Sequence, residues 1–114
     1  MLFLAAVSLF GHHSTSAYDQ EHLTSMTGTV TEFEWANPHA QVHLNVIMPN
    51  GQMENWSAET APPNMLHRAG WTKETLKPGD KITVTGHIAK DGRKIIRVEK
   101  FIMPDGKELS QRTD

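Results

Sequence analysis

The chain has 114 residues, with 11 Lys and Arg against 13 Asp and Glu and a formal net charge of -2. This length allows one domain with a modest core, and the charge lacks the basic excess that a nucleic-acid binder needs, so we expect no nucleic-acid partner. The absence of cysteine excludes disulfides, thiolate zinc sites and a cysteine nucleophile.

The first eleven residues, MLFLAAVSLFG, are apolar apart from Ser8. They are too short to span a bilayer as a helix, which takes about 20 residues, and resemble the apolar region of a secretory signal peptide. We therefore expect residues 1–11 to be a signal peptide cleaved after Gly11, and the mature protein to be exported and to lack a membrane span. The alternative is a short hydrophobic N-terminal strand. Residues 12–24 show no periodicity and form an extended lead-in.

Alternation of apolar and polar residues predicts five strands within a β domain of residues 25–109. These strands cover residues 25–35, 39–48, 52–59, 81–89 and 93–103. In the first strand the apolar residues change phase near Thr31 and Glu32, which predicts a bulge or sharp bend. Between the second and third strands, Asn50-Gly51 predicts a hairpin with a type I′ turn.

One short helix is expected between the third and fourth strands. Pro62-Pro63 ends the sheet, Asn64 is a candidate N-cap, and residues 65–69 supply one or two helical turns. Gly70 suits a left-handed position just past the helix, and Trp71 is expected to pack the helix onto the sheet. Residues 110–114 are predicted to be a polar tail.

Three strands, a helix and two strands is the order of a small five-stranded OB-like barrel. The sequence therefore predicts an all-β, mainly antiparallel protein with one short helix. A closed barrel would protect the strand edges that short hairpins leave open. The alternative architecture is a small β-sandwich or roll.

Several motifs along the chain carry a family resemblance. In order they are HHS, GTVTEFEWANPH, NW, PPNML, GWTKETLKPGD and VTGHIAKDG. With these motifs the chain resembles, from His12 to about Leu109, the small secreted bacterial proteins of the domain of unknown function 6152 family. The resemblance implies a signal peptide and a periplasmic or extracellular β domain. It implies no activity and no ligand.

A metal site is the leading functional hypothesis. If His12 becomes the first residue, its α-amine and its imidazole Nδ1 can chelate one ion, and these groups lose few protons to a metal at neutral pH. Nitrogen donors without thiolates favour copper, as Cu(II), followed by Zn(II) or Ni(II). The other reading of His12 and His13 is a solvated terminal tail.

A third nitrogen would come from His13 or from a histidine of the barrel. His39 and His43 on one regular strand would lie about 13 Å apart, too far to share an ion. We prefer His39 because it lies at the Pro38 corner, although its ring could instead form a local hydrogen bond that holds this corner. We interpret the remaining histidines as surface positions: His22, His67 and His87.

A second hypothesis is a surface for an unknown protein or small ligand. Trp35 and Trp56 could line it, since OB-like barrels often bind ligands across their second and third strands. The alternative is that both indoles fill the core. Scattered acidic residues, with Glu32 and Glu34 on the solvent side, form no recognisable catalytic motif, so we expect a binding protein and not an enzyme.

Overall fold

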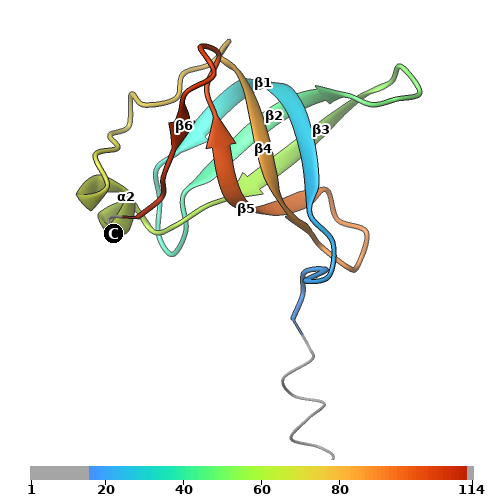
Figure 1. Cartoon of the computed structure of the whole chain (residues 1–114), viewed down its shortest axis with the longest axis horizontal. Helices are drawn as coiled ribbons and strands as arrows, with labels where there is room; N and C mark the ends of the chain where they lie inside the picture. Colours follow the sequence, from blue (N-terminus) through green and yellow to red (C-terminus); the bar gives the residue numbers. More distant parts are fainter. Residues whose placement is uncertain (1–15, 113–114) are drawn as a thin grey trace, which may run out of the picture.

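The computed structural model describes residues 16–112, which form six strands and one short helix (Figure 1). The elements are β1 (Thr24–Glu34), β2 (Gln41–Ile47), β3 (Met53–Glu59), α2 (Pro63–Arg68), β4 (Lys81–Ile88), β5 (Ile95–Ile102) and β6 (Glu108–Leu109). The five predicted strands and the helix are confirmed. The two-residue strand β6 was not predicted, because two residues are too few to show a period.

The sheet closes on itself. Its strand order is β3-β2-β1-β4-β5-β6, and β3 also pairs with β5. This last pairing is parallel, while the others are antiparallel. The result is a closed five-stranded barrel with β6 added beside β5, which confirms the predicted OB-like barrel over a sandwich or roll.

Strand β1 pairs with two neighbours because it bends. Residues 24–29 pair with β4, and residues 28–34 pair with β2. The register with β2 shifts between Val30 and Glu32, so the predicted bulge near Thr31 and Glu32 is confirmed. Glu32 and Glu34 are exposed, as expected.

The predicted type I′ turn at Asn50-Gly51 is wrong. The Met48 N–H donates to the Gln52 carbonyl oxygen, and the Gly51 N–H donates back to Met48, so the loop contains three residues. Only glycines have a positive φ among the described residues, and Gly51 has a φ of 86°. Pro49 explains the difference. Its fixed negative φ suits the first central position of a type I turn, and Gly51 in the left-handed conformation then completes the loop.

Helix α2 and Trp71 close one end of the barrel. The helix begins at Pro63 without a side-chain cap, so the prediction of Asn64 as N-cap is wrong: a proline in the first turn has no N–H to satisfy. Gly70 takes the predicted left-handed conformation, with a φ of 98°. Trp71 is buried, lies 5.2 Å from Phe101 between ring centroids, and donates its Nε1–H to the Ser110 carbonyl oxygen. Its predicted role in packing the helix onto the sheet is confirmed.

Gly86 provides the first testable prediction, since β4 and β5 approach closely where their register shifts between Thr85 and Gly86. A Cβ atom at position 86 would overlap the Arg97 carbonyl group. We expect Gly86→Ala to lower the free energy of unfolding by roughly 1–3 kcal/mol, as overpacking does. Urea unfolding measures this loss. Lys81→Ala, at an exposed position of the same strand, is the control, and equal stability of the two variants would contradict the close approach.

Candidate functional site

The lead-in is docked on the barrel from residue 16 onward. The Asp19 N–H donates to the Ile88 carbonyl oxygen at 2.9 Å, and the Lys90 N–H donates to Ala17 at 2.8 Å. Tyr18 forms an isolated antiparallel bridge with Ala89. In Figure 1 the described lead-in runs along the end of β4, beside the β4–β5 turn. The sequence alone leaves open whether this segment packs on the barrel.

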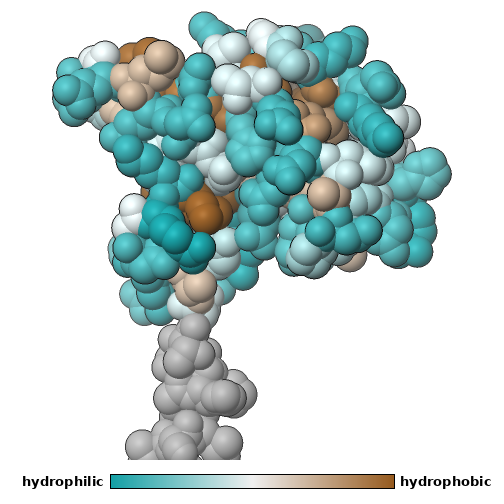
Figure 2. Space-filling view, turned by 180° about the vertical axis from the view of Figure 1, so that it is seen from behind, coloured by the Kyte–Doolittle hydropathy of each residue, from teal (hydrophilic) through white to brown (hydrophobic). Residues whose placement is uncertain are grey.

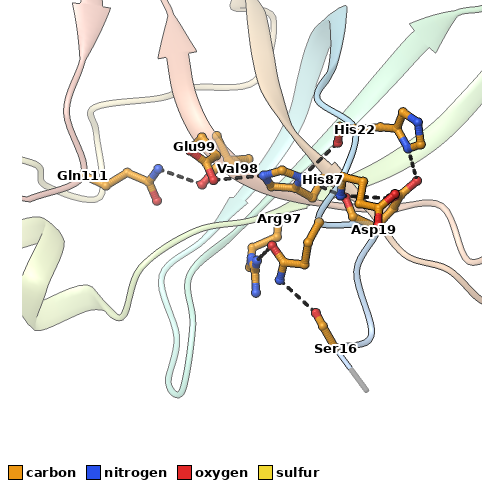
Figure 3. A network of polar contacts seen from close by, with 10 residues as sticks. Ser16, Asp19, His22, His87, Arg97, Val98, Glu99 and Gln111 are labelled. Carbon is orange, nitrogen blue, oxygen red and sulfur yellow. Dashed lines mark hydrogen bonds and ion pairs between the residues drawn. The ribbon is translucent and has the colours of Figure 1, made fainter. Parts of the chain in front are cut away.

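His87 fixes the second half of the lead-in, as Figure 3 shows. The residue is 7% exposed, so the prediction that His87 is a surface position is wrong. Its Nδ1 lies 2.9 Å from the carbonyl oxygens of both Asp19 and His22, and its Nε2 lies 3.0 Å from Glu99 Oε2. Since carbonyl oxygens only accept, the Nδ1–H is the donor to Asp19 and His22, and the Nε2 contact with Glu99 ties the same ring to β5.

Tyr18 fixes the first half of the lead-in against β3 and β5. Its hydroxyl donates to Glu59 Oε1 at 2.8 Å, and the Arg97 guanidinium lies 4.9 Å from the centre of its ring. Burial, together with the hydrogen bond and the negative charge of Glu59, raises the pKa of Tyr18 to about 12, although Arg93 and Arg97 oppose this shift. The phenol therefore stays neutral and keeps donating across the physiological pH range.

His39 presents one ring nitrogen to the same glutamate. Its Nδ1–H donates to the Thr60 carbonyl oxygen at 2.9 Å, which leaves the lone pair on Nε2 in the neutral ring. This Nε2 lies 3.7 Å from Glu59 Oε2. Glu59 therefore has Tyr18 on one oxygen and His39 beside the other. The hydrogen bond to Thr60 is of the kind that orients metal-binding histidines.

His43 differs from His39 in that both of its ring nitrogens have partners. Nδ1 lies 2.9 Å from Ser57 Oγ, and Nε2 lies 3.0 Å from Glu34 Oε1. Within residues 16–112, no group of three or more His, Cys, Asp or Glu side chains that could hold a metal ion is present. His12 and His13 lie outside the described residues, so their metal site stays a prediction.

The two tryptophans of the second hypothesis differ in how deeply they are buried. Trp56 is 7% exposed and donates its Nε1–H to Glu54 Oε1 at 3.0 Å. Trp35 is partly buried against the core, with its ring 5.7 Å from that of Phe33 in an edge-to-face contact. Little of the Trp56 indole is therefore available for stacking with a ligand.

Sequence reasoning missed Tyr18 and Glu59, although the hairpin holds a signal for Glu59. Counting outward from the Pro49–Gly51 turn brings Gln41 opposite Glu59, and this pair is observed. His39 is two residues before Gln41 on an alternating strand, so its side chain belongs diagonal to that of Glu59. Nothing comparable links Tyr18 to Glu59, because that contact joins segments 41 residues apart.

Comparison with known proteins gives one family and a fold. The model of a family of unknown function, DUF6152, matches residues 1–96. No curated protein matches the chain. A solved structure described as a ZRD-deleted mutant of TiaS in complex with agmatine is 17% identical in sequence to this chain and superposes with a TM-score of 0.50. The match covers 84% of this chain and 24% of the TiaS chain. A tRNA fluorescent labeling enzyme is 16% identical in sequence to this chain, with a TM-score of 0.48. The match covers 80% of this chain and 20% of the enzyme's chain.

These similarities extend over a small part of the solved proteins, since this chain spans about a quarter and a fifth of their lengths. At 17% identity, the likeness to the first one concerns the fold alone. The function must therefore be argued from the residues of this chain.

Replacement of His87 tests its role in docking the lead-in. We expect His87→Ala to speed hydrogen exchange of residues 16–23, because the Asp19 and His22 carbonyl oxygens lose their shared donor, and a hydrogen bond contributes roughly 0.5–1.5 kcal/mol to stability. Exchange followed by mass spectrometry measures the change, and His67→Ala on the exposed face of α2 is the control. Unchanged protection of the lead-in would contradict the proposed role of His87.

Tyr18 is the sole tyrosine, so its ionisation can be followed directly by tyrosinate absorbance. We expect a midpoint near pH 12 in the metal-free protein. Because this pKa lies above the ordinary value of 10.0, the stability that Tyr18 contributes is complete below pH 10 and is lost as the pH rises toward 12. Glu59→Gln should move the midpoint toward 10, while Glu54→Gln should not. A midpoint near 10 in the unchanged protein would refute the contact with Glu59.

Proposed function

Because this chain belongs to the DUF6152 family, which has no known function, we propose a function from its own residues: an exported small protein that binds a metal ion, copper first, through the N-terminal histidine of its mature form. Residues 1–11 are the signal peptide, and cleavage after Gly11 leaves His12 with a free α-amine. The protein works by binding, in the periplasm or outside the cell. Among residues 16–112, no helix is long and apolar enough to cross a membrane.

The observation that carries this proposal is the side of the barrel on which the lead-in lies. Tyr18 contacts Glu59, and Nε2 of His39 lies beside the other oxygen of the same carboxylate. Tyr18 is the sixth residue after His12, and an extended segment of six residues reaches roughly 20 Å. The α-amine and imidazole of His12 are therefore within reach of His39.

This arrangement supports a site of three or four nitrogen donors. His12 contributes two of them, His39 contributes Nε2, and His13 is the further candidate. Among first-row divalent ions such a set binds Cu(II) most tightly, with Zn(II) and Ni(II) next. His43 is less suited, since Ser57 and Glu34 occupy both of its ring nitrogens.

A second candidate function is the binding of a small apolar ligand at the end of the barrel away from α2. A hollow of about 440 Å³ lies there, and its lining includes Met26, Val46, Trp56 and Ile88. Ile47 and Met53 on the adjoining hairpin are exposed by 66% and 60%, and Figure 2 shows apolar atoms gathered over this hairpin. In this case the histidines are incidental, and Ile47→Asp, at an exposed position of the lining, would abolish binding of the ligand while leaving metal binding unchanged.

Copper titration of two forms of the protein tests the leading proposal. The form that begins at His12 should bind one Cu(II) tightly, because its free α-amine is a ligand. A form with one additional residue before His12 loses that amine as a chelating partner and should bind at least roughly 10-fold more weakly, as seen when a metal site is disturbed. Competition titration with a chelator measures both affinities.

The intact mass of the secreted protein, recorded with and without Cu(II), fixes the first residue and the stoichiometry together. Equal affinities of the two forms, or a mature chain that starts elsewhere than His12, would rule out the N-terminal site. The matched control is His67→Ala in the form that begins at His12, because His67 lies on the exposed side of α2.

A further inference from the structure

The hairpin that joins β2 and β3 carries a pair of apolar side chains beyond the barrel. Ile47 and Met53 lie opposite each other and are 66% and 60% exposed. The pairing of β2 with β1 ends at Val46, so the end of the hairpin projects from the barrel (Figure 1). Single exposed apolar side chains are ordinary, whereas a pair on one projection indicates a surface that another molecule covers.

An apolar hollow lies directly beside this projection. Its volume is about 440 Å³, and Ile47 lines it together with Met26, Val46 and Trp56. The projecting pair and the lining of the hollow therefore form one continuous surface, which we call the hairpin patch. No charged side chain is among the described residues that line the hollow, so an apolar side chain can fill it without burying an unpaired charge.

Strand edges without a partner border both parts of the hairpin patch. In the described chain, residues 24–27 of β1 line the hollow and pair only with β4, because the pairing with β2 begins at Gly28. Within residues 16–112, residues 53–56 of β3 pair only with β2, because the pairing with β5 begins at Ser57. These edges present backbone N–H and C=O groups with which another extended strand can pair. A hydrocarbon chain cannot use them.

A second copy of this chain has the features that match the hairpin patch. In a twofold dimer the same surface of each copy faces the other, so a projection beside a hollow lets both copies insert at once. The projection brings apolar side chains for the hollow and a free strand edge for its rim. A formal net charge of only -2 opposes the approach of two copies weakly.

We infer that this chain forms a reversible twofold dimer in which Ile47 and Met53 of each copy occupy the hollow of the other. The inference does not depend on the proposed metal site, because neither residue is a candidate ligand. Two side chains and one hollow make a small contact, and interfaces below roughly 1,200 Å² in total are typical of weak, transient complexes. We therefore expect the dimer at high micromolar concentrations and the monomer after dilution.

A small apolar ligand is the competing occupant of the hollow, as in the second candidate function. Such a ligand would fill the hollow of a single copy and would leave the mass of the protein in solution monomeric. Only the dimer makes the occupation of the hollow depend on protein concentration.

Sedimentation equilibrium at several concentrations compares three proteins that begin at His12: the unchanged chain, Ile47→Asp and Met65→Asp. A chelator is present, so that no metal ion bridges two copies. We expect Ile47→Asp to weaken dimerisation at least roughly 10-fold, because burial of such an apolar side chain is lost. Met65 is the matched control, since it is an exposed apolar residue of α2, at the other end of the barrel, and Met65→Asp should dimerise like the unchanged chain.

Two outcomes would overturn the inference. One is an unchanged chain that stays monomeric at millimolar concentration, and the other is an Ile47→Asp variant that dimerises as tightly as the unchanged chain. If the unchanged chain is monomeric and its hollow binds an uncharged apolar dye, the small ligand is the occupant and the dimer is refuted. None of these results bears on the copper titration, so the inference and the metal proposal fail separately.

Methionine methyl resonances locate the contact in the unchanged protein, without any substitution. Met26 and Met48 line the hollow and Met53 lies on the projection, whereas Met65 lies on α2. A rise in protein concentration should shift the signals of the first three residues and leave that of Met65 in place. A dimer that forms without these shifts would have another interface and would overturn the inference.

Discussion

The bend in β1 is the constraint on which the rest of the structure depends. A strand has two edges, and β1 uses one for β4 along its first half and the other for β2 along its second half. The bulge between Val30 and Glu32 turns the chain between these two pairings. With β2 and β4 thus carried to opposite sides, β3 and β5 meet in parallel and close the barrel.

Closure also decides where the polar lead-in can bind. Strands β3 and β5 pair over only three residues on each side, from Ser57 and Ile95 onward. Tyr18 lies across this short seam, with its hydroxyl on Glu59 of β3 and its ring against Arg97 of β5. The lead-in therefore covers a short pairing of the barrel, and His39, the candidate metal ligand of the barrel, lies beside the same glutamate.

Strand alternation made most of the fold predictable, because the pattern reports which face of a strand is buried. It predicted the β2 core from Ala40 to Val46 and the bulge in β1. It failed at His87, which alternation places outward beside the inward Gly86. His87 is buried there by the lead-in, and a segment that arrives from 65 residues away leaves no trace in the local pattern.

The candidate site was predictable only in part, because it too depends on contacts between segments that are distant in the sequence. His39 could be chosen over His43 from its corner position. The tautomer of its ring, however, depends on the carbonyl oxygen of Thr60, which lies on the other side of the hairpin of β2 and β3. Hydrogen bonds and one cation–π contact hold the lead-in, whereas its Leu23 side chain is 62% exposed. Such a segment belongs to the less stable part of a protein. If an ion joins His12 in the lead-in to His39 on the barrel, docking must strengthen metal binding by the same free energy by which the metal strengthens docking.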